Sequence, residues 1–208
     1  MLKRIAIALL MMFTCSQAFA EFDVRLNYAM LAAPKSFNSE TDKLIAGYPA
    51  LKAPSDLGLD VVFVMPIMPV EFGARYEMIN TGTASAIGVD AKFEATRVSL
   101  LGGYRFINTL AYFGVLAHLG VSNSGTYTQT SGGTTTKYTA KFGPSYGLGV
   151  EGGAKIAMLI VGGEIGYTAL KATTLTDPTG SKVTTSTGSD LALDLSGPYV
   201  RISAGVNF

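Results

Sequence analysis

The sequence predicts an all-β fold, namely a transmembrane up-and-down antiparallel β-barrel of eight strands with extended extracellular hairpins. Three observations predict it. Apolar and polar residues alternate with a period of two along most of the chain, as in strands that have two different faces. Short and long connections alternate between the expected strands, which is typical of barrels made in a membrane. The 24 glycines and the recurring Thr/Ser stretches suit short strands that are joined by turns.

Eight segments show the alternation. The segment 70–78 is the clearest, because Phe72 and Tyr76 fall on one face while Glu71 and Arg75 fall on the other. A helix with these residues would scatter its charges around the axis. The eight expected strands are 22–30, 57–65, 70–78, 97–105, 111–119, 146–155, 159–167 and 200–208.

The connections divide into two kinds. Tight turns are expected at 66–69, 106–109 and 155–158, whereas the other connections are longer. Two of the long ones are predicted to form hairpins of their own. Residues 126–139 are Thr-rich around a glycine turn, and residues 173–185 flank Asp-Pro-Thr-Gly, a type I turn signal. Flexible low-complexity loops are the alternative interpretation of both stretches.

The alternation alone does not say which face points outward, since a soluble lipocalin-like barrel also alternates with its apolar side inward. The polar face is rich in glycine, including Gly73 and Gly162, and an eight-stranded interior has room for large side chains only beside small ones. The charges on that face balance, six acidic against six basic. We therefore expect a lumen network of paired ions, with the apolar face toward lipid. Its members are Asp23, Arg25, Asp60, Glu71, Arg75, Glu77, Arg97, Arg105, Glu151, Lys155, Glu164 and Arg201.

The last ten residues form the most specific pattern. Apolar residues alternate up to a terminal phenylalanine, and they are Val200, Ile202, Ala204, Val206 and Phe208. This end resembles the C-terminal signal that barrel-assembly machinery reads. With the strand pattern of 21–208 it is similar to the small outer-membrane barrels, the OmpX/Ail proteins and the membrane domain of outer membrane protein A. The resemblance implies a Gram-negative outer-membrane protein with both termini periplasmic.

The first twenty residues have the pattern of a secretory signal peptide. Lys3 and Arg4 precede a short apolar stretch, and Ala18-Phe19-Ala20 supplies a small-x-small cleavage site. The stretch is shorter than the roughly 20 residues that a membrane helix needs. We expect 1–20 to be removed and 21–208 to form one barrel domain. Cys15, the chain's single cysteine, lies in this segment and lacks the small preceding residue of a lipidation site.

Composition narrows the function classes. Without Lys3 and Arg4 the chain keeps 14 of its 16 basic residues against 15 acidic ones, which gives no sign of a nucleic-acid partner. No disulfide or thiolate chemistry is expected in a mature chain without cysteine. The expected partners are the lipid bilayer with lipopolysaccharide, the assembly machinery and an extracellular ligand at the loops. The chain is expected to be a monomer.

A catalytic site is not expected. His118 is the single histidine, and the alternation places it in the lumen, where we interpret it as a hydrogen-bonding residue. A Ser–His–acid arrangement would need a serine beside it. Ser122 lies about 13 Å from His118 along the strand. Ser99 lies on a neighbouring strand, and nothing in the sequence places it beside His118. No cofactor is expected, and no His/Asp/Glu cluster has the spacing of metal ligands.

Two functions remain at this point. The first is a non-enzymatic structural or adhesive surface barrel that presents Thr/Ser-rich loops and has a lumen closed by charge pairs. Its hairpin edges could accept a further strand. The second is a lipid A-modifying barrel enzyme or a narrow pore for small solutes.

Overall fold

The computed structural model describes residues 21–65 and 68–208. The expected signal peptide, 1–20, lies outside the described residues, as does part of the expected turn at 66–69. The strands are β1 (Glu21–Met30), β2 (Ser55–Val64), β3 (Val70–Asn80), β4 (Ala84–Ala86), β5 (Val89–Asn108), β6 (Ala111–Ser131), β7 (Thr134–Phe142), β8 (Ser145–Ile156), β9 (Leu159–Ala169), β10 (Lys171–Thr176), β11 (Leu193–Asp194) and β12 (Gly197–Asn207). The helix is α2 (Lys35–Leu44). No helix in the described ranges is long and apolar enough to cross a membrane.

Eight of the strands form a closed antiparallel barrel. The hydrogen-bonded order is β1, β2, β3, β5, β6, β8, β9 and β12. The ring closes because β12 pairs back onto β1, with Tyr28 opposite Ile202 and Arg25 opposite Gly205. At the very end, the Phe208 N–H donates to the Phe22 carbonyl at 3.0 Å. The predicted fold class is therefore confirmed.

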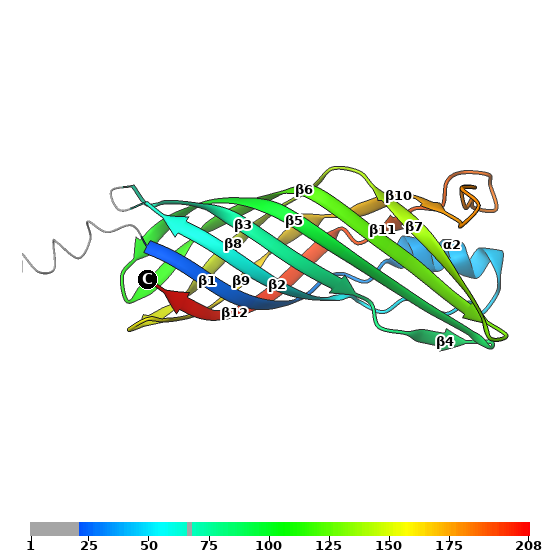
Figure 1. Cartoon of the computed structure of the whole chain (residues 1–208), viewed down its shortest axis with the longest axis horizontal. Helices are drawn as coiled ribbons and strands as arrows, with labels where there is room; N and C mark the ends of the chain where they lie inside the picture. Colours follow the sequence, from blue (N-terminus) through cyan, green and yellow to red (C-terminus); the bar gives the residue numbers. More distant parts are fainter. Residues whose placement is uncertain (1–20, 66–67) are drawn as a thin grey trace, which may run out of the picture.

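The two ends of the barrel differ (Figure 1). The start of β1, the C-terminus and the short connections β5–β6 and β8–β9 lie at one end, which we call the terminal end. At the other end β5 and β6 continue as strands of 20 and 21 residues. Their outer parts combine with β4, β7, β10, β11 and α2 into a second body, which we call the extension. The sequence placed barrel strands only at 97–105 and 111–119, whereas β5 begins eight residues earlier and β6 runs on without a break into the first arm of the hairpin expected at 126–139.

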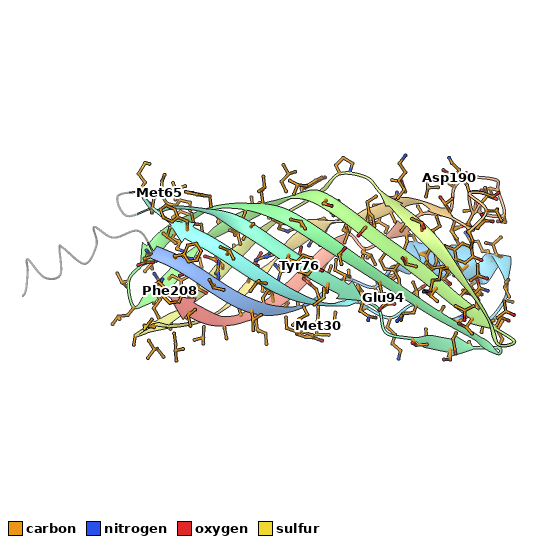
Figure 2. All side chains as sticks on the ribbon, in the orientation of Figure 1. Met30, Met65, Tyr76, Glu94, Asp190 and Phe208 are labelled. Atoms are coloured by element: carbon orange, nitrogen blue, oxygen red, sulfur yellow. The ribbon has the colours of Figure 1, made fainter. Side chains whose placement is uncertain are left out.

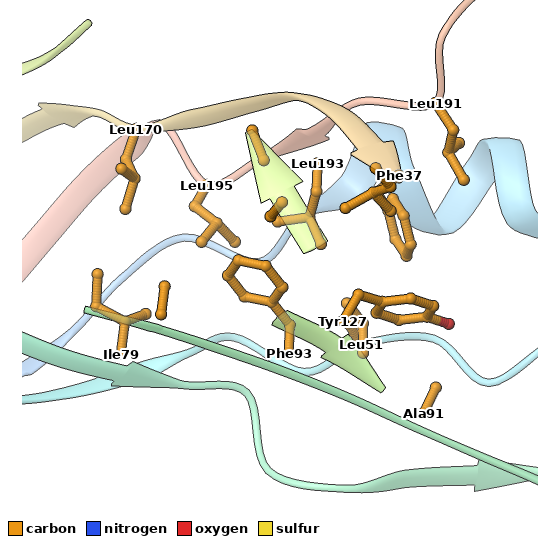
Figure 3. Close-up of a cluster of buried hydrophobic side chains, with 14 residues drawn as sticks. Phe37, Leu51, Ile79, Ala91, Phe93, Tyr127, Leu170, Leu191, Leu193 and Leu195 are labelled. Atoms are coloured by element: carbon orange, nitrogen blue, oxygen red, sulfur yellow. The ribbon is translucent and has the colours of Figure 1, made fainter. Parts of the chain in front are cut away.

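The extension has an apolar core of its own. Figure 3 shows Phe37 of α2, Phe93 and Leu193 pointing toward one another between the helix and the sheet. The rings of Phe37 and Tyr127 meet edge to face, with their centroids 5.3 Å apart. The core comprises Phe37, Leu51, Ile79, Ala91, Phe93, Ala95, Tyr127, Ala140, Leu170, Ala172, Leu175, Leu191, Leu193 and Leu195.

The helix α2 was not expected from the sequence. Only Phe37 and Thr41 of it are buried, so its apolar stripe is too narrow to stand out. The Asn38 side chain holds the helix to the returning chain, since it donates to the Leu51 carbonyl at 2.9 Å and accepts from the Leu51 N–H at 2.9 Å. These contacts bring Leu51 into the core.

The two expected hairpins fare differently. The first is present as β6 and β7, with Thr126 opposite Thr139 and a turn at Gly132 and Gly133, both of which have positive φ. The second is formed only in part. The turn at 177–181 is present, and the expected arms meet at the bridge of Thr176 to Lys182 and at the hydrogen bond from the Val183 N–H to the Leu175 carbonyl. The first arm is β10, which pairs along its length with β7 and β11 instead, and Thr184 bridges to Asp190. Burial of the alternating Leu191, Leu193 and Leu195 in the core explains why this later segment takes the place beside β10.

Candidate functional site

The barrel interior is the candidate site, and it is lined by charges. All twelve residues that the alternation assigns to the polar face point into the lumen and are between 0 and 7% exposed. They are Asp23, Arg25, Asp60, Glu71, Arg75, Glu77, Arg97, Arg105, Glu151, Lys155, Glu164 and Arg201. Because alternate residues of a strand share a face, neighbouring strands deliver these side chains to one narrow volume.

Arg105 is the centre of the cluster nearest the terminal end. Its Nη2 atom lies 2.8 Å from the carboxylates of both Asp23 and Glu71, and its Nε lies 3.3 Å from Glu151. The Arg25 Nη1 atom donates to the same Glu151 at 2.8 Å. Two guanidinium groups and three carboxylates thus meet at this level of the lumen.

Arg75 marks the next level toward the extension. It donates two parallel hydrogen bonds of 2.8 Å to Asp60, from Nε and Nη2, and its Nη2 atom also lies 2.8 Å from Glu164. Planar two-point pairing of this kind is the strongest arginine–carboxylate geometry. Asn27 donates to the same Asp60 at 2.8 Å, so that carboxylate accepts three hydrogen bonds.

Arg201 and Arg97 share Glu77 at the level nearest the extension. Arg97 donates to Glu77 from Nε at 2.5 Å and from Nη2 at 2.8 Å. The Arg201 Nη2 atom lies 2.6 Å from Glu77 and 2.8 Å from Asp56. Arg201 also reaches Glu164 at 3.4 Å, which links this cluster to the level below. The chain of contacts therefore runs along much of the lumen.

The outer face of the barrel is the opposite of the interior. Its outward positions carry large exposed apolar side chains, such as Leu26, Leu148 and Ile165, which are 62–64% exposed. Along the barrel parts of the described strands, these positions hold no Asp, Glu, Lys or Arg. On β1 the outward apolar row runs from Phe22 to Met30, which is roughly 20 Å of height at a tilt of about 40°. That matches the ~25 Å apolar band of membrane barrels.

Solved structures are similar to this chain, and two of them are outer-membrane proteins. The crystal structure of Neisserial surface protein A matches with 12% identity and a TM-score of 0.47, covering 90% of this chain and 95% of that one. A major outer membrane protein from Thermus thermophilus matches with 14% identity and a TM-score of 0.47, covering 91% of this chain and 100% of that one. No family model and no curated protein matches the chain.

Two buried or half-buried acids of the network were missed from the sequence. Asp56 is fully buried and pairs with Arg201, and Glu21 accepts from Lys155 at the terminal end. Both stand at strand ends, just outside the apolar alternation. Asp56 shares the parity of Gly58 and Asp60, and that signal could have found it. With Asp56, the described lumen holds seven buried carboxylates, one more than the expected six.

The glycines of the inward face make room for the largest lumen side chains. A Cβ on Gly162 would lie 1.9 Å from the Tyr112 hydroxyl, and one on Gly147 would lie 2.0 Å from the His118 Nε2. Tyr112 in turn lies under Arg105, whose guanidinium carbon is 4.8 Å from the ring centroid. Small and large residues therefore complement one another across the interior.

His118 lies in the lumen, is 3% exposed and packs edge-on against Tyr199. Neither of its ring nitrogens has a hydrogen-bond partner among the described residues, so the hydrogen bonds expected of it are not formed there. The buried Ser99 hydroxyl is without a partner in the same sense. Ser122 lies four residues after His118, so strict alternation would place both side chains on one face, but Ser122 is exposed because a bulge opposite Val98 and Ser99 shifts the register. A Ser–His hydrogen bond is therefore not present in the described chain.

Two further expectations concern ligands and the C-terminus. Among residues 21–65 and 68–208, no group of three or more His, Cys, Asp or Glu side chains is arranged to hold a metal ion. The alternating C-terminal residues lie on the outward row of β12, where Val200, Ile202 and Phe208 are 59–64% exposed.

Proposed function

We propose that this chain is an integral outer-membrane barrel of a Gram-negative cell. The observation that carries the proposal is the pairing of a charge-free apolar outer face with an ion-paired interior on one closed ring of strands. A closed ring of strands satisfies all its backbone groups inside lipid, because it has no open edge. The terminal end, with its short turns, would face the periplasm, and the extension would project from the cell.

The experiment is fractionation of cells that express the full chain, with the protein folded in its own membrane. The barrel should stay with the outer membrane after carbonate and urea extraction, and its gel mobility should change on boiling. A protein that is extracted as a soluble species, with the same mobility before and after boiling, would refute the proposal.

We further propose that the barrel is a non-enzymatic structural or surface protein whose lumen is closed. Three levels of ion pairs across the interior support this. Arg75, Arg105 and Arg201 each contact two or more carboxylates. Arg25 and Arg97 each contact one. Moving such a group aside would leave buried charges without partners, at a cost of several kcal/mol. Large and stable single-channel openings of the purified protein in a planar bilayer would contradict a closed lumen.

The adhesive version of this function is supported by the outer face of the extension. Its strands carry hydroxyl groups there, including those of Thr126, Thr128 and Thr130. Strand addition finds little room, since β7 is paired on both sides and the outermost strands β4 and β11 have three and two residues. A ligand would therefore bind the face rather than the edges. Replacing these three threonines by glutamine, while the core stays intact, should lower cell attachment; unchanged attachment would remove the adhesive role.

A further inference from the structure

A long groove crosses the outer face of the molecule where the barrel meets the extension. Its volume is about 1,210 Å³, which exceeds the range of roughly 300–1,000 Å³ for pockets that hold drug-sized ligands. Two neighbouring cross-strand rows form most of it. One row is Tyr28, Leu57, Met78, Thr96 and Ser124, and the other is Ser55, Asn80, Glu94, Thr126, Thr139 and Thr176.

The groove changes character along its length. At one end Tyr28, Leu57 and Met78 continue the exposed apolar face of the barrel, and each is 45–51% exposed. From β5 onward both rows consist of hydroxyl and other polar side chains, together with Lys141 of β7. Figure 2 shows Met30 and Glu94 near this boundary, on strands β1 and β5. The groove therefore joins a lipid-like surface to a water-facing one.

The polar end offers both donors and acceptors with little net charge. The hydroxyl groups of Thr96 and Ser124 share a hydrogen bond of 2.7 Å. Each hydroxyl can still form further hydrogen bonds with a ligand. Glu94 is neutralised by Lys92, whose Nζ lies 2.9 Å away, and it accepts weakly from Asn80 at 3.4 Å. Lys141 adds one positive charge at the far end. Such a surface suits a polyhydroxylated group that carries an anionic substituent.

We propose that this groove holds a glycolipid of the surrounding leaflet. Its acyl part lies on Tyr28, Leu57 and Met78, and its sugar head lies on the hydroxyl rows of β5, β6 and β7. The reason for a lipid is position, because the apolar end is part of the face that the membrane covers, and a molecule already in the leaflet reaches both ends. The proposal rests on the membrane insertion proposed above, and it adds a defined ligand class and place.

The test uses lipid A as the probe. The full chain, processed and folded in its membrane, is purified and placed in bilayer discs of phosphatidylethanolamine and phosphatidylglycerol with a small share of lipid A, and the retained lipid A is measured by native mass spectrometry. The variant Thr126→Val with Thr139→Val removes a facing pair of groove hydroxyls and keeps two β-branched residues. Its matched control is Thr130→Val with Thr135→Val, a facing pair of the same hairpin outside the groove, whose hydroxyls share a 2.9 Å hydrogen bond.

The groove variant should retain about tenfold less lipid A than the parent, as expected for the loss of one or two hydrogen bonds, and the control should match the parent. Equal retention by the parent and both variants would overturn the proposal. If the parent retained as much phosphatidylglycerol as lipid A, the proposal would also be overturned, since the sugar head would then not be recognised. Binding of the deacylated lipid A head group as tight as that of the whole lipid would exclude the role of the apolar end.

Failure of the membrane proposal gives a different result. A chain that does not insert shows no mobility change on boiling in any variant, whereas a chain that inserts but retains no lipid A contradicts the groove alone. Both double variants should keep the boiling-dependent mobility of the parent, because their substitutions lie outside the apolar band and the core.

Discussion

Ala95 and Arg97 lie two residues apart on the inward face of β5, and between them the interior of the molecule changes from apolar to ionic. Ala95 belongs to the core of the extension, while Arg97 belongs to the ion network of the barrel. The outward face changes in the opposite sense, from Thr96 to Val98. The two faces of the strand therefore exchange character at a single level, which is where a membrane surface would lie.

Replacing Arg97 by methionine tests the network at this level. The change leaves Glu77 and Asp56 with Arg201 as their remaining guanidinium, so buried negative charge is no longer balanced. We expect the free energy of unfolding to fall by about 3–5 kcal/mol, measured by urea titration in lipid vesicles. The control is Lys92→Ala on the outward face of the same strand, where an exposed ion pair with Glu94 is worth about 0–1 kcal/mol. Equal losses in the two variants would contradict the buried network.

The exchange of faces also explains what could be predicted from the sequence. The eight barrel strands were placed from an apolar face alternating with a polar one, and their barrel portions agree with the structure within a few residues. On the extension side of Arg97, from Val89 to Thr96, the period of two persists, but the polar side chains point outward and the apolar ones point inward. A search for one constant pattern therefore began β5 too late, at residue 97, and ended the barrel strand within β6 too early, at residue 119.

The partners in the lumen could not be predicted for a different reason. Parity says which charges share a face, but a contact such as that between Arg201 and Asp56 joins residues 145 positions apart across the interior. Such pairs depend on the shear of the closed ring and on which glycines leave space. The core of the extension was missed because α2 shows no clear period and the alternation of 191–195 covers only five residues.

Replacing Leu148 by arginine tests which face lies in lipid. Leu148 is on the outward row of β8, and a charge at mid-depth of a bilayer costs about 2–4 kcal/mol. We expect lower stability in vesicles and less folded protein in the outer membrane. Thr128→Arg, on the outward face of the extension, should behave as the parent. A Leu148→Arg protein that folds and fractionates like the parent would place this face outside the membrane.

Gly162→Ala tests the fit of small and large lumen residues. The new methyl group would lie 1.9 Å from the Tyr112 hydroxyl, and we expect overpacking to cost about 1–3 kcal/mol of unfolding free energy. Adding Tyr112→Leu should recover part of that loss, which a double-mutant cycle measures as a coupling energy. Gly102→Ala is the control, since its Cβ would meet nothing within 4 Å. Additive effects of Gly162→Ala and Tyr112→Leu would show that the two residues do not share space.

Asp177 predicts an acid sensitivity confined to the tip of the extension. Its side chain accepts hydrogen bonds from the Thr179 hydroxyl and from the N–H groups of Thr179 and Ser181, and these hold the pKa of the carboxyl below its ordinary 3.8. Because the folded pKa is the lower one, the turn is stabilised above pH 3.8 and loses that stabilisation as the pH falls through the folded pKa.

Hydrogen exchange of the turn amides 179–181, followed from neutral to acidic pH, should therefore show protection that disappears only below pH 3.8. The variant Asp177→Asn keeps an acceptor oxygen without a titrating group, so its protection should be weaker at neutral pH and independent of pH in this range. Exchange at these amides that rises equally in both proteins on acidification would mean that another group controls the turn, because only the parent carries the titrating carboxyl.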